Sequence, residues 1–168
     1  ESLLANGYAL DSSDTGTGKT AVASYVAGTI RYNGVLVVCP KAVIASWEEW
    51  MGKVPRYADR HAVINWEKLR TGKTPFVSRR GKRFEWHMDD DMLIIFDECH
   101  MAKTRNTLNS KLVVAARKQA IPSLFLSATP FQSPMETQAL GFALGLHDGE
   151  KGYWKFINDH GCYKGRFG

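Results

Sequence analysis

A stretch rich in glycine and threonine, residues 11–20 (DSSDTGTGKT), has residue types that could hold a phosphate chain. Two glycines would let backbone N–H groups approach phosphate oxygens, and the helix predicted to follow would offer its N-terminus to the same anion. The usual phosphate-binding pattern, G-x-x-x-x-G-K-[ST], has a glycine where this chain has Ser13. A chance Gly/Thr-rich turn before a helix is the alternative. The strand–loop–helix context favours an ATP-binding loop made of Thr15, Gly16, Thr17, Gly18, Lys19 and Thr20.

Two residues of this loop would act on the phosphates and on a metal ion. Lys19 would neutralise the β- and γ-phosphates of ATP, and the hydroxyl of Thr20 would bind Mg²⁺. The loop therefore predicts two cofactors, ATP and Mg²⁺.

A pair of carboxylates, Asp97 and Glu98, follows the apolar run MLIIF at residues 92–96. Ligands of α/β proteins bind at the carboxyl ends of the parallel strands, which would bring this pair to the edge that carries the glycine loop. Asp97 would hold Mg²⁺, directly or through water, and Glu98 would orient and deprotonate the attacking water. Such a pair alone is more often a solvated strand end, and the preceding glycine loop favours a catalytic site.

The elements that must position these residues alternate along the chain. Apolar runs predict strands at 8–11, 35–39, 61–65, 92–96 and 123–127. Amphipathic or alanine-rich segments predict helices at 20–32, 42–51, 109–120 and 133–146. Alternation of this kind predicts an α/β fold, a parallel sheet flanked by helices on both faces. The irregular segment 70–91 is basic at its centre and could fold as a hairpin that turns at Gly81.

Composition sets broad limits on the function. With 168 residues, the chain is long enough for one domain, and 44% hydrophobic with 23% charged residues is typical of globular proteins. No apolar run is long enough to span a bilayer and no signal-peptide pattern is present, which predicts an intracellular, cytoplasmic protein without a membrane partner, in the host cytoplasm if it is viral. A net charge of +5 is compatible with an anionic partner. The three cysteines form no C-x-x-C pair, which favours free thiols over a zinc site. His160 and Cys162 form an H-x-C pair, but the sequence has no second pair that would complete a metal site with them.

The strings GTGKT, DECH and SATP, in this order, resemble motifs I, II and III of the first RecA-like domain of superfamily 2 helicases of the DEAD/DEAH type. VLVVCPKAVIASWEEW resembles motif Ia of the Snf2-like translocase branch, VINWEKLR resembles the segment after the next strand, and DECHMAKTRNTLNSK resembles the acidic motif with its following loop. The resemblance covers about residues 8–146. It implies a RecA-like P-loop NTPase domain that hydrolyses ATP with Mg²⁺ to move on nucleic acid, with DNA favoured over RNA by the Cys-Pro and VINWEKL features.

The resemblance also assigns roles to single residues. Lys19, Asp97 and Glu98 would be catalytic, with Thr20 and Asp97 as metal ligands. The coupling residues, which would link hydrolysis to movement, are His100, Ser127 and Thr129. Cys99 replaces the usual alanine and Ser13 replaces an alanine or glycine, and both are small.

Nucleic-acid contacts are predicted at Lys41, Arg79, Arg80 and Lys82. A charged hairpin can equally be a solvated surface. For Trp47 and Trp50, three residues apart on one helix face, core packing is favoured over base stacking.

The whole chain is expected to be a single domain, residues 1–168, corresponding to the N-terminal half of a two-domain motor. Relatives bind ATP between two RecA-like domains, and the second supplies an arginine to the site. That domain is therefore an expected partner, and Trp154 and Phe156 are expected to pack on it. By itself the chain would be a monomer and a poor nucleic-acid-dependent ATPase. The alternatives are an RNA helicase domain, a small P-loop kinase and a non-catalytic nucleotide-binding module.

Overall fold

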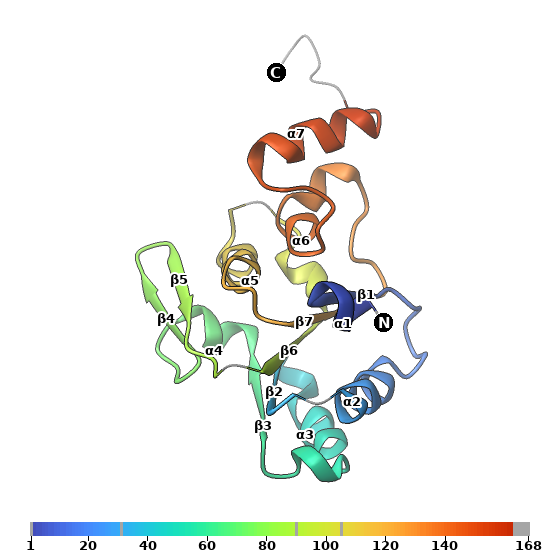
Figure 1. Ribbon diagram of the computed structural model, residues 1–168, viewed down its shortest axis with the longest axis vertical. Coiled ribbons are helices and arrows are strands. Elements are labelled where there is room, and N and C mark those ends of the chain that lie inside the picture. The colour runs from blue at the N-terminus through green and yellow to red at the C-terminus, as the bar shows by residue number, and fades with distance from the viewer. Residues whose placement is uncertain (1, 31, 90, 105, 163–168) are drawn as a thin grey trace.

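A parallel β-sheet forms the centre of the molecule (Figure 1). The computed structural model describes residues 2–30, 32–89, 91–104 and 106–162. The sheet has five strands in the order β1-β7-β6-β2-β3, and each neighbouring pair runs parallel. Its strands are β1 (Tyr8–Asp11), β2 (Gly34–Cys39), β3 (His61–Asn65), β6 (Met92–Asp97) and β7 (Ser123–Leu126).

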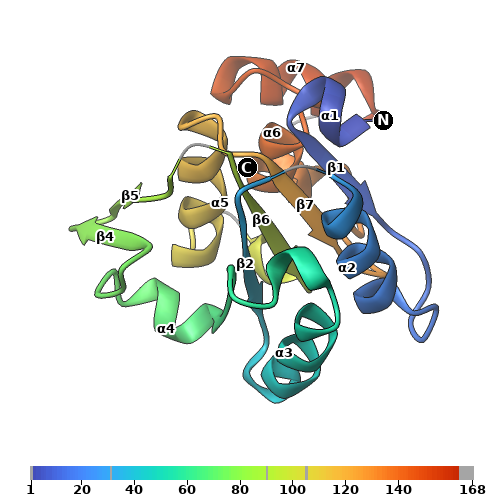
Figure 2. The same ribbon diagram turned by 60° about the horizontal axis from the view of Figure 1, so that its bottom comes forward.

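Helices cover both faces of this sheet, as the sequence predicted (Figure 2). Successive side chains of β2 point to opposite faces, so that Val35 and Val37 join one apolar core while Leu36 and Val38 join the other. The first core is covered by α1 (Ser2–Asn6), α2 (Lys19–Thr29) and α3 (Ile44–Gly52). The second is covered by α4 (Trp66–Arg70), α5 (Leu108–Lys118) and α6 (Thr137–Ala143). Burial on both sides explains why β2 is a continuous apolar run.

The strand order brings three chain segments to the same sheet edge. β7 lies between β1 and β6, and Leu126 is level with Asp11 on one side and with Asp97 on the other. The glycine loop follows β1, Glu98 follows β6 and Ser127 follows β7. All three predicted motifs therefore start from adjacent strand ends.

Most predicted elements are present with shifted ends. The helix predicted at 20–32 ends at Thr29, and the one predicted at 133–146 is a short 3-10 turn, η4 (Pro134–Glu136), followed by α6. The helix predicted at 42–51 is likewise a 3-10 turn, η1 (Lys41–Val43), followed by α3. The other 3-10 turns are η2 (Pro55–Tyr57) and η3 (Cys99–Ala102). The sequence did not predict α1, α4 or α7 (Glu150–Asp159), of which the first two have five residues each.

The basic segment folds as the hairpin that the sequence predicted. β4 (Val77–Arg80) and β5 (Arg83–Trp86) pair antiparallel, and the turn contains Gly81 with a positive φ of 62°. Trp86 fixes the hairpin to α5 because its indole Nε1 donates to the carbonyl of Leu112 at 3.0 Å. The side chain of Gln119 also accepts from the Trp86 backbone N–H at 2.8 Å and donates to its carbonyl at 3.0 Å. The hairpin is thus held rigidly on the second face of the sheet.

The last described helix, α7, lies against α6, and its Tyr153 and Ile157 side chains are buried. Trp154 is 39% exposed and lies beside Tyr153, while the Phe156 ring lies beside His147 and His160. The expected packing of Trp154 and Phe156 on another domain stays a prediction. Within the described part of the chain, no helix combines the length and the apolar character that crossing a bilayer requires.

Candidate nucleotide site

The glycine loop, residues 12–18, connects β1 to α2 and is folded on itself. Gly16 and Gly18 have φ values of 80° and 81°, a region that side chains disfavour, so the glycines are needed for this turn. The hydroxyls of Ser13 and Thr17 lie 3.0 Å apart, and that of Thr17 also donates to the carbonyl of Asp14 at 2.7 Å. Ser13 thus contributes a hydroxyl contact that the glycine of the usual pattern lacks.

Lys19, the first residue of α2, points its ammonium group back over this loop. Its Nζ donates to the carbonyls of Ser13 at 2.8 Å and Asp14 at 2.7 Å. A bound phosphate would have to draw the ammonium away from these two acceptors. Thr20 lies in the first turn of α2, where the backbone N–H groups have no acceptor within the helix. Thr15 is exposed at the tip of the loop.

The acidic pair lies where β6 ends. Four consecutive residues of β6 are buried, and Asp97 follows them half-buried. Glu98 has a positive φ of 49°, a strained value for a residue other than glycine. Strain of this kind is found at functional sites, and the Glu98 carboxylate lies 3.0 Å from Nδ1 of His100.

Burial raises the pKa of the Asp97 carboxyl above its ordinary value. Three groups oppose this effect and favour the charged form: the indole of Trp47, the backbone N–H of Glu98 and the positive charge of Lys19. The Lys19 contribution indicates that the glycine loop and the acidic pair share one electrostatic environment. Oδ1 accepts from the Glu98 N–H at 3.0 Å and Oδ2 from Trp47 at 2.8 Å, and each oxygen keeps a further lone pair. Such hard oxygen donors suit Mg²⁺.

His100 connects the acidic pair to the end of β7. Its Nδ1 lies 3.0 Å from Oε2 of Glu98 and 3.1 Å from the hydroxyl of Ser127, which is buried. The Ser127 hydroxyl also accepts from the backbone N–H of Thr129 at 3.3 Å. Thr129 itself is exposed and takes part only through its backbone.

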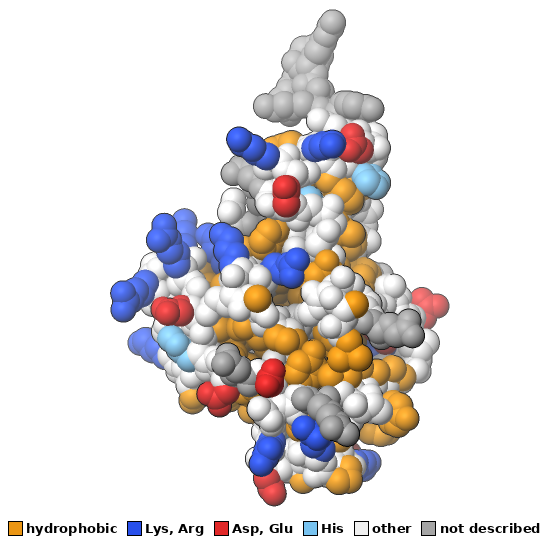
Figure 3. Space-filling view, viewed as in Figure 1, with side chains coloured by type: hydrophobic (Ala, Val, Ile, Leu, Met, Phe, Trp, Pro, Cys, Tyr) orange, Lys and Arg blue, Asp and Glu red, His pale blue; other side chains and the backbone are white. Residues whose placement is uncertain are grey.

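The four residues predicted to contact nucleic acid do not form one cluster. Lys41 is exposed in η1, directly after β2, whereas the other three lie on the hairpin. Both ribbon views show α4 between the hairpin and α3, which follows Lys41 (Figures 1 and 2). Arg79 donates to the carbonyl of Arg70 at 3.0 Å and lies over the Phe84 ring, so it is partly engaged within the hairpin. Arg80 and Lys82 are exposed, and Lys and Arg side chains gather on this side of the molecule (Figure 3).

Sequence reasoning missed the aromatic shell around Asp97. Trp47 is fully buried, which confirms that it packs in the core, and it also donates to the carboxylate. Trp66 donates from Nε1 to the Asp97 backbone carbonyl at 3.0 Å. Trp50 is 38% exposed and lies against Lys53. In the sequence, nothing about Trp47 or its neighbours indicated that its indole would bond to Asp97.

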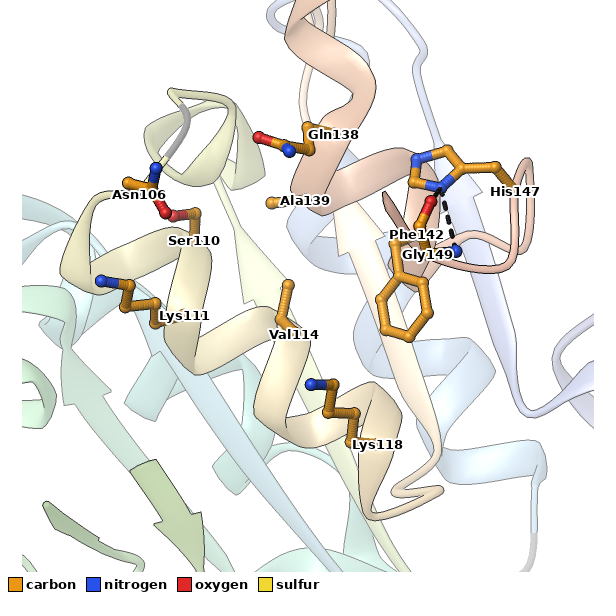
Figure 4. A pocket seen from close by; sticks show the side chains of 10 residues that line it. All are labelled: Asn106, Ser110, Lys111, Val114, Lys118, Gln138, Ala139, Phe142, His147 and Gly149. Atoms are coloured by element: carbon orange, nitrogen blue, oxygen red, sulfur yellow. Dashed lines mark hydrogen bonds between the residues drawn. The ribbon is translucent and has the colours of Figure 1, made fainter. Parts of the chain in front are cut away.

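A groove of about 430 Å³ lies between α5 and α6 (Figure 4). Lys111 and Lys118 of α5 face Gln138 and Phe142 of α6 across it, and His147 closes one end. None of the predicted site residues lines this groove. Among the described residues, no group of three or more histidine, cysteine or carboxylate side chains lies close enough together to bind a metal ion. His160 and Cys162 therefore belong to no such group.

A parallel sheet with a glycine loop after β1 and an Asp-Glu pair at the end of β6 defines a RecA-like P-loop domain. No protein-family model matches the chain. A mimivirus protein (Acanthamoeba polyphaga mimivirus) with the name "Putative ATP-dependent RNA helicase L364" is 32% identical over 156 residues, covering 78% of this chain and 28% of that protein. The structure titled "Sulfolobus solfataricus SWI2/SNF2 ATPase core in complex with dsDNA" matches with a TM-score of 0.52 and 17% identity, over 89% of this chain and 38% of that one.

These likenesses confirm the resemblance to superfamily 2 helicases and the Snf2-like form of the fold. The chain spans 28% of the mimivirus protein and 38% of the Sulfolobus chain.

Proposed function

We propose that this chain is the ATP-binding domain of a superfamily 2 motor that hydrolyses ATP with Mg²⁺ and moves on nucleic acid. The observation that carries the proposal is the meeting of three motifs at adjacent strand ends: the loop with Lys19, the pair Asp97 and Glu98, and Ser127 joined to Glu98 through His100. In such an arrangement, a change at Glu98 during hydrolysis would be passed through His100 to Ser127, at the end of β7.

Each of these side chains has a task in the proposed reaction. Lys19 and the N-terminus of α2 would bind the phosphates, and Thr20 and Asp97 would hold Mg²⁺, which would supply positive charge against the phosphates. Glu98 orients a water molecule and accepts its proton as that oxygen attacks the γ-phosphorus, so ADP and inorganic phosphate are formed. The Glu98 side chain is 43% exposed, so its carboxylate is accessible to a water molecule.

For the nucleic acid, we propose contacts at Lys41 and at the basic hairpin with Arg79, Arg80 and Lys82. Lys41 lies just after β2, at the sheet edge that carries the proposed nucleotide site. A nucleic-acid strand bound at Lys41 would therefore lie near that site. DNA is the favoured partner because of the Cys-Pro and VINWEKL sequence features, and RNA is the alternative.

We further propose that a second RecA-like domain completes the site with an arginine. Asp97, Glu98 and Lys19 come from this chain, and the proposed cation that stabilises the transferring phosphoryl group would come from the second domain. The relatives are longer than the matched region, which is compatible with this arrangement.

Titration calorimetry of the chain with ATP in the presence of Mg²⁺ tests the nucleotide part. We expect saturable one-to-one binding that EDTA weakens, and absence of binding at millimolar ATP would overturn the proposed nucleotide site.

Fluorescence anisotropy with labelled duplex DNA, single-stranded DNA and RNA of equal length tests the proposed nucleic-acid partner. Loss of a phosphate contact should lower the slope of log affinity against log salt by about 1. Lys41→Ala and the double variant Arg80→Ala with Lys82→Ala should therefore lower this slope, while Lys53→Ala, at the C-terminal cap of α3 and beside Trp50, serves as the control.

A further inference from the structure

Trp47 is the only tryptophan of the described chain whose indole N–H is bonded to a carboxylate. The side chain is fully buried on α3, and its Nε1 lies 2.8 Å from Oδ2 of Asp97, 50 residues further along the chain. The indole group is a donor without acceptor capacity, so this contact favours the ionised carboxylate as its partner. A hydrogen bond to a charged group is stronger than one between neutral groups.

The remaining polar atoms of Asp97 are also held. Oδ1 accepts from the Glu98 N–H, and the backbone carbonyl accepts from Nε1 of Trp66. Because each carboxylate oxygen has its own donor, rotation of the carboxylate would break at least one hydrogen bond. The orientation of Asp97 is therefore fixed before any ligand binds.

Trp47 is itself held in place by packing. It belongs to the core on the first face of the sheet together with Met51, one turn further along α3, and Tyr57. Movement of the indole would disturb this packing, so the donor presented to Oδ2 has a constant position.

We propose that Trp47 is a positioning residue that holds the Asp97 carboxylate in the orientation that binds Mg²⁺ with ATP. The inference rests on the proposed ATPase function, since it concerns the metal ligand of that site. Trp47 touches neither the nucleotide nor the metal in this proposal and acts only through Asp97. The indole contact also offsets part of the cost of keeping a partly buried carboxylate charged.

The variant Trp47→Phe tests this idea because phenylalanine keeps an aromatic ring and removes the N–H donor. The affinity for ATP is measured by calorimetry with Mg²⁺ and with EDTA, and the ratio of the two dissociation constants gives the gain due to the metal. We expect Trp47→Phe to reduce this gain about three- to tenfold while the affinity in EDTA stays within about twofold. Trp50→Phe, three residues on in the same helix but without a contact to Asp97, should leave both values unchanged.

An equal loss of affinity with and without Mg²⁺ would mean that Trp47 has a structural role only and would overturn the proposal. An unchanged metal gain in a folded Trp47→Phe protein would overturn it as well. If wild type binds no ATP under either condition, the proposed function fails first, so the two failures are distinguishable.

A second measurement does not depend on whether Trp47→Phe folds. In ¹H–¹⁵N spectra of the wild type, the indole N–H signal of Trp47 should shift when Mg²⁺ is added to the ATP-bound protein, and it should shift in Asp97→Ala without ligand. The indole signal of Trp50 should stay in place in both experiments. A Trp47 signal that is unaffected by Asp97→Ala would contradict the contact on which the proposal is built.

Discussion

The imidazole of His100 lies 3.1 Å from the hydroxyl of Ser127, and thus joins the segment after β6 to the end of β7. The same Nδ1 atom lies 3.0 Å from the carboxylate of Glu98. A single nitrogen therefore faces the proposed catalytic base on one side and a residue of the SATP segment, which follows β7, on the other. A change in the charge or position of Glu98 during hydrolysis would alter the contact with Ser127.

His100→Ala should separate ATP hydrolysis from its stimulation by nucleic acid. The side chain contacts Glu98 and Ser127 but is not proposed to touch ATP, so ATP affinity should stay within about twofold. In a protein that joins this chain to the proposed second domain, stimulation by nucleic acid should fall about tenfold, which lies within the usual range of coupling between two sites. Ser127→Ala should act in the same way, and the double variant should lose little more than either single one. Additive losses would argue against a shared contact.

Lys19→Ala should weaken binding of ATP with Mg²⁺ about tenfold, because the ammonium group is the proposed partner of the phosphates. Its present partners are two carbonyls of the loop, so the fold should keep its thermal unfolding temperature within a few degrees. Calorimetric titration gives the affinity. Lys53→Ala is a matched control, since Lys53 is an exposed lysine paired with Glu49. Equal affinities of wild type and Lys19→Ala would rule out the phosphate role.

Much of the fold could be predicted because its strands are apolar runs with clear ends. The run at 35–39 is buried on both sides of the sheet, and Cys39 marks its end in both the pattern and the structure. The strand order could not be read from the sequence, because periodicity describes one strand at a time and not its neighbours. Short helices such as α4 escaped prediction since five residues show little more than one period.

Only part of the candidate site could be predicted, because a sequence displays local motifs but not contacts between distant residues. Lys19, Asp97 and Glu98 belong to local motifs, which a sequence displays directly. The hydrogen bond from Trp47 to Asp97 spans 50 residues, and only the packing of α3 on the sheet brings the two together. The same limit applies to the hairpin, whose attachment to α5 depends on Trp86 and Gln119, 33 residues apart.

Glu98→Gln should abolish most hydrolysis and leave ATP bound. Glutamine has nearly the size of glutamate and can still accept a hydrogen bond from His100, but it cannot take a proton from water. In a protein that joins this chain to the proposed second domain, the rate of phosphate release should fall by ~10² or more. Glu49→Gln, at an exposed position on α3, should have no effect on this rate. An unchanged turnover of Glu98→Gln would assign the base to another residue.

The three cysteines should react at very different rates. Burial raises the pKa of the Cys39 thiol to about 12 and also raises the pKa of Cys99, with nearby carboxylates adding to both effects. A raised thiol pKa leaves little thiolate, so at about pH 8 Cys39 should react with iodoacetamide roughly a thousandfold more slowly than a free cysteine, and Cys99 should also react slowly. Cys162 is partly exposed and should be labelled first. Mass spectrometry of native and unfolded protein checks the order, and rapid native labelling of Cys39 would contradict the core packing.

Binding and catalysis should separate in the chain of 168 residues itself. Under our proposal it holds the phosphate ligand Lys19, the metal ligand Asp97 and the base Glu98, but not the arginine that stabilises the transition state. Nucleotide should therefore bind weakly and be hydrolysed ~10³-fold or more below the rate of a protein in which this chain is joined to the proposed second RecA-like domain. Nucleic acid should stimulate this chain little, because the proposed coupling is a closure between two domains. Phosphate release is measured with and without duplex DNA, single-stranded DNA and RNA, for both proteins side by side. Robust stimulated turnover by these residues alone would show that the site is self-sufficient, and the two-domain proposal would then be abandoned.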